Sequence, residues 1–152
     1  MDFGLNLYSI RNLIQSESDF MDTSLKLRDM GYSYMQYSGG PYDPEVMRRV
    51  SRASGLPIVV THVPLDRILN DTDALMREHA CFGCRNIGLG MLPKDMLLNR
   101  ELYKATVDKL EGLTAYIDKN VSFKKWYAGH FHGHYDVDDS HTIIYTDAVE
   151  LE

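Results

Sequence analysis

Strand-like and helix-like patterns of apolar positions alternate along the first 117 residues. Four short segments have the β-branched and aromatic content of strands, and they cover residues 3–8 (FGLNLY), 32–37 (YSYMQY), 57–61 (PIVVT) and 86–89 (NIGL). Apolar residues at helical spacing follow each of them, over residues 18–30, 44–54, 71–82 and 99–117. The pattern therefore predicts a strand followed by a helix, four times in succession.

Residues at the ends of the helical segments support these boundaries. Asp43 is a suitable N-cap and Pro44 suits the first helical position. Gly31, Gly55 and Gly83 each follow a helical segment, where glycine commonly ends a helix.

Strands that alternate with helices favour a parallel sheet with right-handed crossovers, and hence an α/β fold. A complete barrel of eight β/α units needs roughly 250 residues, whereas the chain has 152. We therefore expect a partial barrel of about four β/α units.

The pattern changes after residue 118. Residues 123–134 (FKKWYAGHFHGH) and 142–151 (TIIYTDAVEL) have the character of two strands on either side of an acidic turn. No helix separates them, so we expect a short antiparallel two-stranded tail. The predicted domains are a partial β/α barrel over residues 1–118 and a β-rich tail over residues 119–152.

Charge, apolar content and cysteine content narrow the function classes. The net charge is −6, from 16 basic and 22 acidic side chains, which argues against a nucleic-acid partner. No apolar run approaches the length of a membrane span, and the N-terminus lacks the features of a signal peptide. Two cysteines are too few for a disulfide framework, which favours a reducing cytoplasm.

Three histidines in the segment GHFHGHYD are the densest cluster of metal-binding side chains. His130, His132 and His134 alternate along the chain, so in a strand they share one face, and Asp136 continues the row. Imidazole and carboxylate ligands suit a divalent metal such as zinc, manganese or iron. The alternative is a polar strand face that is rich in histidine.

His62 follows the strand-like run IVVT directly. In parallel α/β folds, ligands bind beyond the carboxyl ends of the strands, so His62 is a candidate substrate-binding residue. The same reasoning marks Tyr8 and Gln36, which lie at the ends of two other strand segments. The alternative for His62 is a histidine that hydrogen-bonds only within its own loop. The alternative for Tyr8 and Gln36 is that their side chains only pack at the edge of the sheet.

Three other features carry less chemistry. Cys81 and Cys84 have CxxC spacing at a helix end, which favours buried structural cysteines over a redox pair. The segment Gly88-Leu89-Gly90 is too short for a dinucleotide-binding fingerprint. His79 lies within a helical segment, as a surface or packing residue.

The first 117 residues resemble the N-terminal half of the sugar phosphate isomerase/epimerase family, whose members are xylose-isomerase-like barrels. The stretches that carry the resemblance are GLNLYSIRNL, YMQYSGG, GLPIVVTHVPLDRI and DTDALMREHACFGCRNIGLGMLP. The resemblance implies that His62 is the histidine at the substrate rim, and that Gln36 stands where many relatives place a glutamate. In that family the metal ligands come from later strands, so no residue here inherits their role.

Residues 123–151 are similar to the end of calcineurin-like metallophosphoesterases. His130 and His132 match that family's W-x-x-G-H-x-H strand, which begins here at Trp126, whereas His134 is outside the motif. The similarity implies metal binding and a phosphate-ester substrate. The family's upstream D-x-H, G-D-x-x-D and G-N-H motifs are absent.

These resemblances lead to three functional hypotheses. The first is a truncated sugar phosphate isomerase/epimerase that acts on a small phosphorylated sugar, with a homodimer through the open sheet edge supplying further strands. The second is a metal-binding phosphoesterase that uses the GHFHGH strand. The third is a folded, non-catalytic remnant of a fused or deleted reading frame.

Overall fold

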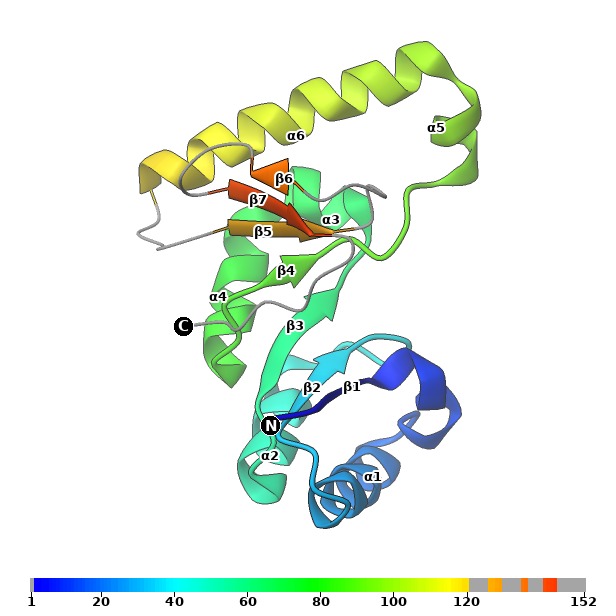
Figure 1. Cartoon of the computed structure of the whole chain (residues 1–152), viewed down its shortest axis with the longest axis vertical. Coiled ribbons are helices and arrows are strands. Elements are labelled where there is room, and N and C mark those ends of the chain that lie inside the picture. The colour runs from blue at the N-terminus through cyan, green and yellow to red at the C-terminus, as the bar shows by residue number, and fades with distance from the viewer. Residues whose placement is uncertain (1, 121–125, 130–134, 137–140, 145–152) are drawn as a thin grey trace. The chain divides into compact units, whose positions relative to one another are not determined.

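A four-stranded parallel sheet forms the centre of the first part of the chain (Figure 1). The protein is described by a computed structural model that covers residues 2–120, 126–129, 135–136 and 141–144. The strands lie in the order of the chain, and they are β1 (Gly4–Asn6), β2 (Tyr34–Tyr37), β3 (Ile58–His62) and β4 (Ile87–Gly88). All three strand pairings are parallel, which confirms the predicted α/β class.

Helices connect the strands and form a layer beside the sheet. The described helices are the 3₁₀ helix η1 (Leu7–Leu13), α1 (Glu17–Asp29), α2 (Pro44–Ser54), α3 (Leu65–Asn70), α4 (Thr72–Phe82), α5 (Lys94–Leu98) and α6 (Arg100–Asn120). Helix α1 packs against α2, and α2 packs against α4. Right-handed crossovers between strands that follow in one direction place their helices on the same face, as these packing contacts require.

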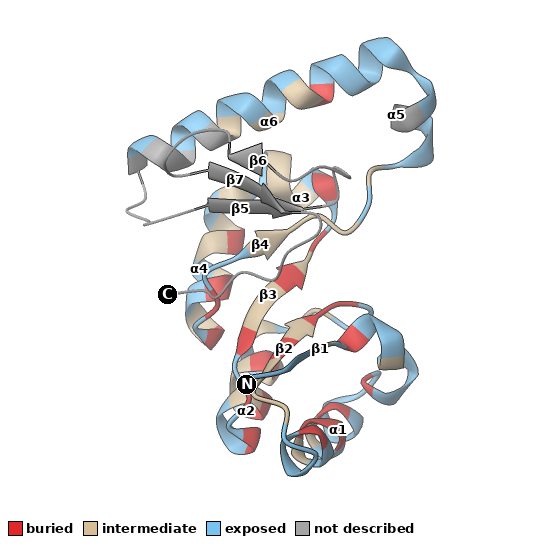
Figure 2. Ribbon diagram, viewed as in Figure 1, coloured by how far each residue is buried: buried red, intermediate tan, exposed pale blue. Residues whose placement is uncertain are grey.

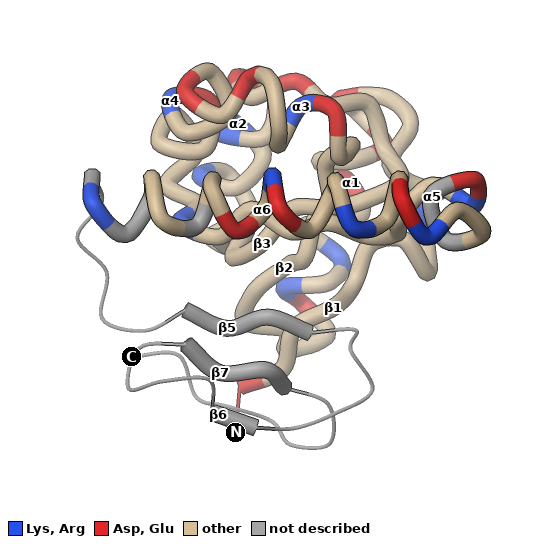
Figure 3. The backbone as a smooth tube through the Cα atoms, turned by 90° about the horizontal axis from the view of Figure 1, so that it is seen from above, with Lys and Arg blue, Asp and Glu red and all other residues tan. Residues whose placement is uncertain are grey.

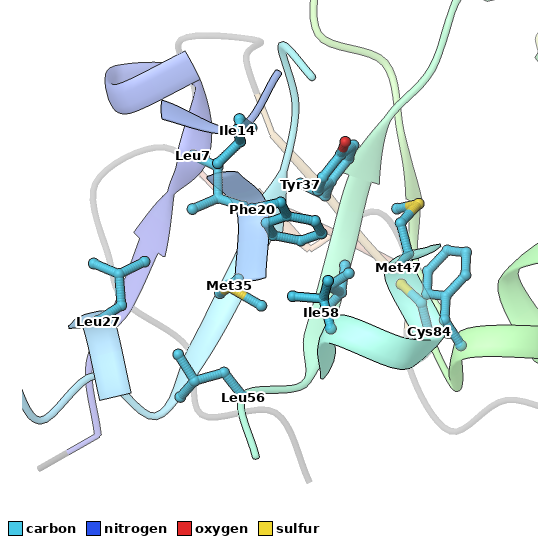
Figure 4. Close-up of a cluster of buried hydrophobic side chains, with 12 residues drawn as sticks. Leu7, Ile14, Phe20, Leu27, Met35, Tyr37, Met47, Leu56, Ile58 and Cys84 are labelled. Carbon is cyan, nitrogen blue, oxygen red and sulfur yellow. The ribbon is translucent and has the colours of Figure 1, made fainter. Parts of the chain in front are cut away.

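The hydrophobic core lies between this helix layer and the sheet (Figure 4). Met35 and Tyr37 of β2 and Ile58 of β3 point into it and are almost fully buried. Phe20 of α1 packs against Tyr37 with their ring centroids 5.1 Å apart, and Met47 and Val50 contribute from α2. Figure 2 shows buried residues concentrated in β2, β3 and parts of α1 and α2.

Cap residues define α2 as the sequence predicts. The side chain of Asp43 accepts hydrogen bonds from the backbone N–H groups of Glu45 and Val46 at 3.0 and 3.1 Å. Pro44 occupies the first helical position, and Gly55 ends the helix with a left-handed φ of 72°. Only glycine adopts this conformation without strain, so α2 has a fixed beginning and a fixed end.

Charged side chains of both signs are mixed on the helices. Figure 3 shows basic and acidic residues interspersed along α6. Arg49 of α2 forms a bidentate ion pair with Glu17 of α1, with N–O distances of 2.7 and 2.9 Å. Both side chains are about half exposed, so this pair adds little stability beyond that of the core.

The chain divides into two compact units, Met1–Ala105 and Thr106–Glu152. Helix α6 begins in the first unit and continues into the second. The predicted boundary after residue 118 separates two segments that resemble different families. The compact units do not test that boundary, so it stays a prediction.

The second unit contains a three-stranded sheet whose pairing differs in part from our expectation. The strands β5 (Trp126–Gly129), β6 (Tyr135–Asp136) and β7 (His141–Ile144) lie in the order β5-β7-β6. Strands β6 and β7 are antiparallel, but β6 lies beyond the predicted strand of residues 123–134 and ends at Asp136, within the predicted acidic turn. However, β5 pairs with β7 in parallel, so the antiparallel prediction is wrong for that pair. The strand predicted over residues 123–134 is too long, because β5 ends at Gly129.

Candidate functional site

Two predicted site residues come together at the carboxyl ends of β2 and β3. The strand register aligns Gln36 with Val60, and His62 follows two residues after Val60, so Gln36 and His62 share one face of the sheet. The Gln36 amide Nε2 lies 2.9 Å from His62 Nε2. With the amide nitrogen as donor, the imidazole accepts at Nε2 and carries its proton on Nδ1.

Two glycines make room for the His62 ring. A Cβ on Gly90 would lie 2.9 Å from His62 Nδ1, and a Cβ on Gly88 would lie 2.7 Å from the Thr61 carbonyl oxygen and 3.0 Å from His62 Cδ2. Any larger residue would therefore displace the ring or the neighbouring strand. Sequence analysis missed this role, because it tested the segment Gly88-Leu89-Gly90 only as a nucleotide-binding motif.

A pocket of about 290 Å³ opens beside His62. One wall is formed by residues 37–40 and Tyr42, which follow β2. The other wall is formed by residues 62–64 and Arg67 at the end of β3 and the start of α3. This volume is at the lower limit for small-molecule sites, so the pocket suits one sugar ring and is too small for a dinucleotide.

Arg67 lies in the pocket wall with its charge already neutralised. Its guanidinium forms hydrogen bonds of 3.0 and 3.1 Å to Glu78 and one of 2.7 Å to Asp71. These two carboxylates raise the pKa of Arg67 above its ordinary value. The guanidinium also lies over the Tyr42 ring, with its carbon 5.7 Å from the ring centroid. Arg67 therefore holds the wall in place and offers little positive charge to a ligand.

A buried histidine, His79, contacts the pocket residue Tyr42. His79 of α4 is only 2% exposed. Its Nδ1 donates to the Leu75 carbonyl at 2.8 Å, and its Nε2 accepts from the Thr61 hydroxyl at 2.7 Å. Burial lowers the pKa of His79, so the ring is held neutral. The Tyr42 hydroxyl lies 3.3 Å from Nδ1, which links this packing residue to the pocket.

Tyr8 lies next to the pocket but not at a strand end. Strand β1 ends at Asn6, where the side chain accepts from the Tyr8 backbone N–H and the Ser38 hydroxyl, both at 3.0 Å. Those bonds begin η1, and Tyr8 lies within it with 54% of its surface exposed. The predicted strand over residues 3–8 is therefore too long, because Asn6 caps the helix that replaces its last residues.

The predicted metal ligands His130, His132 and His134 lie outside the described residues. Within the part of the chain that the structure describes, no group of three or more His, Cys, Asp or Glu side chains could hold a metal ion. The divalent metal therefore stays a prediction.

Both cysteines are free thiols. Cys84 is buried, as predicted, and burial raises its pKa to about 11. The same prediction is wrong for Cys81, which is partly exposed. Its thiol donates to the Glu45 carboxylate at 3.2 Å, which raises its pKa. Neither environment favours the reactive thiolate.

Comparisons with protein-family models, curated proteins and solved structures found no match to this chain. In the described residues, no helix has both the length and the apolar character needed to cross a membrane. The functional interpretation therefore rests on the sheet topology and on the residues at its carboxyl edge.

Proposed function

We propose that this chain is a sugar phosphate isomerase/epimerase-like protein that binds a small phosphorylated sugar at the carboxyl edge of its parallel sheet. The observation that carries this proposal is the contact between Gln36 and His62 at the ends of adjacent strands, beside a pocket of sugar size. Ligands of parallel α/β folds bind at this edge.

The strand order supports a half barrel as the scaffold. In doubly wound sheets the strand order reverses at the ligand-binding point, whereas β1 to β4 follow one another without reversal. The helices α1, α2 and α4 form one continuous layer. In a β/α barrel the helices likewise lie on one face of the sheet and the other face lines the interior. Gln36 and His62 belong to the face opposite the core residues Met35 and Tyr37.

The described side chains suit recognition of sugar hydroxyl groups. The Gln36 amide offers both a donor and an acceptor, and His62 offers the two ring nitrogens of its imidazole. Proton transfer and metal binding need further groups, which the resemblance assigns to later strands of the barrel. A second copy of this chain would bring the four parallel strands to eight, the number in a complete barrel.

Calorimetric titration with ribose 5-phosphate and other pentose and hexose phosphates tests this proposal. We expect one of them to bind, and His62→Leu and Gln36→Leu to weaken binding by about tenfold or more, because each removes a hydrogen bond to the ligand. Lys26→Gln, on an exposed part of α1, is the control and should bind as the wild type does. Unchanged affinity in both site variants, or no binding to the wild type, would overturn the proposal.

Exchange of substrate hydrogen with solvent deuterium distinguishes an enzyme from a remnant that only binds. Isomerases and epimerases of this type remove a proton beside a carbonyl group, so turnover labels the bound sugar phosphate at that carbon. Binding without deuterium incorporation, with and without added manganese or zinc, would favour the non-catalytic remnant over the isomerase.

Metal-dependent phosphoester hydrolysis is the second candidate function. The observation in its favour is that the motif GHFHGH begins where β5 ends at Gly129, so a strand leads directly into the histidines. Elemental analysis of the purified chain should then find stoichiometric zinc, manganese or iron, and His130→Ala should remove it. Equal metal content in the wild type and in this variant would contradict metal binding by this segment.

A further inference from the structure

An arginine and a tyrosine of η1 form a stacked pair beside the candidate pocket. The Arg11 guanidinium carbon lies 4.6 Å from the centroid of the Tyr8 ring. Arg11 Nη1 also donates to the Tyr8 carbonyl at 3.0 Å. The ring and the carbonyl together hold the cation in one position, although both side chains are exposed. We refer to these two residues as the Tyr8–Arg11 pair.

The Tyr8–Arg11 pair is fixed against the turn that lines the pocket. A Cβ on Gly39 would lie 2.9 Å from Arg11 Cβ and 3.0 Å from Tyr8 Cδ2, so the pair packs directly on the glycine backbone. The Gln15 amide donates to the carbonyls of Arg11 and Gly39 at 2.6 and 2.9 Å and ties the two segments together. Gly39 belongs to the pocket wall, so the pair and the pocket share one turn.

Arg11 is better suited than Arg67 to bind an anion. Arg67, in the pocket wall, is neutralised by Glu78 and Asp71. No acidic side chain of the described residues forms an ion pair with Arg11, and its guanidinium makes a single hydrogen bond to those residues. A guanidinium has five N–H donors, so most of them remain for a ligand.

We propose that the Tyr8–Arg11 pair binds the phosphate group of the ligand, while His62 and Gln36 bind its sugar. This inference rests on the proposed function for its ligand, but the phosphate site can be tested by itself. A planar guanidinium matches two phosphate oxygens at once, and its fixed position reduces the entropy lost on binding.

Inorganic phosphate is the first probe, titrated into the ¹⁵N-labelled chain while backbone amide shifts are recorded. We expect saturable shifts at Tyr8, Arg11 and Gly39, which weaken as salt is raised. Arg11→Gln should bind phosphate about tenfold more weakly, because it removes a charge-assisted contact, and Arg11→Lys should restore part of the affinity. Arg52→Gln is the matched control, since Arg52 is an exposed cation in the last turn of α2, at the amino edge of the sheet.

Equal phosphate affinity in the wild type and Arg11→Gln would overturn the inference, as would saturable shifts only elsewhere in the chain. Ribose 5-phosphate and ribose then separate this inference from the proposed function. If Arg11→Gln lowers the affinity for ribose 5-phosphate but not for ribose, both the phosphate site and the proposed function hold. If ribose 5-phosphate binds through His62 equally well in Arg11→Gln, only the phosphate site is wrong. If phosphate binds at Arg11 but neither sugar perturbs His62, only the proposed function is wrong.

Discussion

The position of the His62 side chain depends on two neighbouring glycines, Gly88 and Gly90. Gly90 adjoins the ring nitrogen Nδ1, and Gly88 adjoins the Thr61 carbonyl oxygen. The two glycines therefore act on different parts of the site. An added methyl group at residue 90 meets a side chain that can rotate, whereas one at residue 88 meets backbone that cannot move without shifting a strand.

Alanine substitutions separate these effects. Gly90→Ala should turn the His62 ring and weaken ligand binding while leaving the melting temperature nearly unchanged. Gly88→Ala should lower the free energy of unfolding by about 1–3 kcal/mol, because overpacking strains the sheet. Gly112→Ala is the control, because a Cβ there meets no atom within 4 Å and the residue lies in α6. Equal effects of the substitutions at 88 and 90 would contradict this account.

Because His79 is buried, we expect the free energy of unfolding to depend on pH. Burial holds its pKa below the ordinary value of 6.5, so as the pH falls below 6.5 the unfolded chain takes up a proton that the folded chain does not. Stability contributed by His79 is therefore present above pH 6.5 and is lost as the pH falls, by up to about 1.4 kcal/mol per pH unit.

Urea unfolding at pH 7.5 and 5.5 measures this loss. His79→Gln should lose less stability between these two pH values than the wild type does. The lowered pKa values of Glu17 and Glu45 affect stability only below their ordinary value of 4.5, so they do not contribute in this range. Parallel losses in the wild type and the variant would show that His79 is not the group responsible.

The sequence predicted the polar residues of the candidate site and missed the residues that support them. His62 and Gln36 could be found because the ends of parallel strands meet at one edge. The roles of Gly88 and Gly90 depend on a neighbouring strand, and the position of Arg11 depends on Gly39, which lies 28 residues further along the chain. Such contacts leave no local pattern in a single sequence.

Among the helices, those with strong end signals were predicted, whereas the short helix α3 was not. Asp43, Pro44 and Gly55 mark the ends of α2, and Gly83 ends α4, as expected. Helix α3 was missed because it has six residues and no side-chain hydrogen bond at its N-cap.

The N-cap of α2 offers a test at this scale. Asp43→Ala removes both side-chain hydrogen bonds to the first turn, so we expect the free energy of unfolding to fall by about 1 kcal/mol. Asp22→Ala, at an exposed position within α1, removes the same charge without a cap and is the control. Chemical denaturation of both variants measures the difference, and equal stabilities would show that the cap contributes nothing.

At the scale of the whole molecule, the described residues form a parallel sheet of four strands, with β1 and β4 at its two edges. Exposed strand edges favour association. If two copies complete an eight-stranded barrel, light scattering after size exclusion should give twice the chain mass of 17.4 kDa. A mass equal to that of one chain at micromolar concentration would contradict the dimer and leave the single sheet as the binding unit.

The central claim is that the carboxyl edge of the parallel sheet is the ligand-binding site. The most direct test is an amide-shift titration of the labelled chain with ribose 5-phosphate and related sugar phosphates. We predict saturable shifts in residues 37–40 and 62–64 and in Arg67, which lie in the two walls of the pocket. The absence of saturable shifts there, or saturable shifts confined to another part of the chain, would contradict the account.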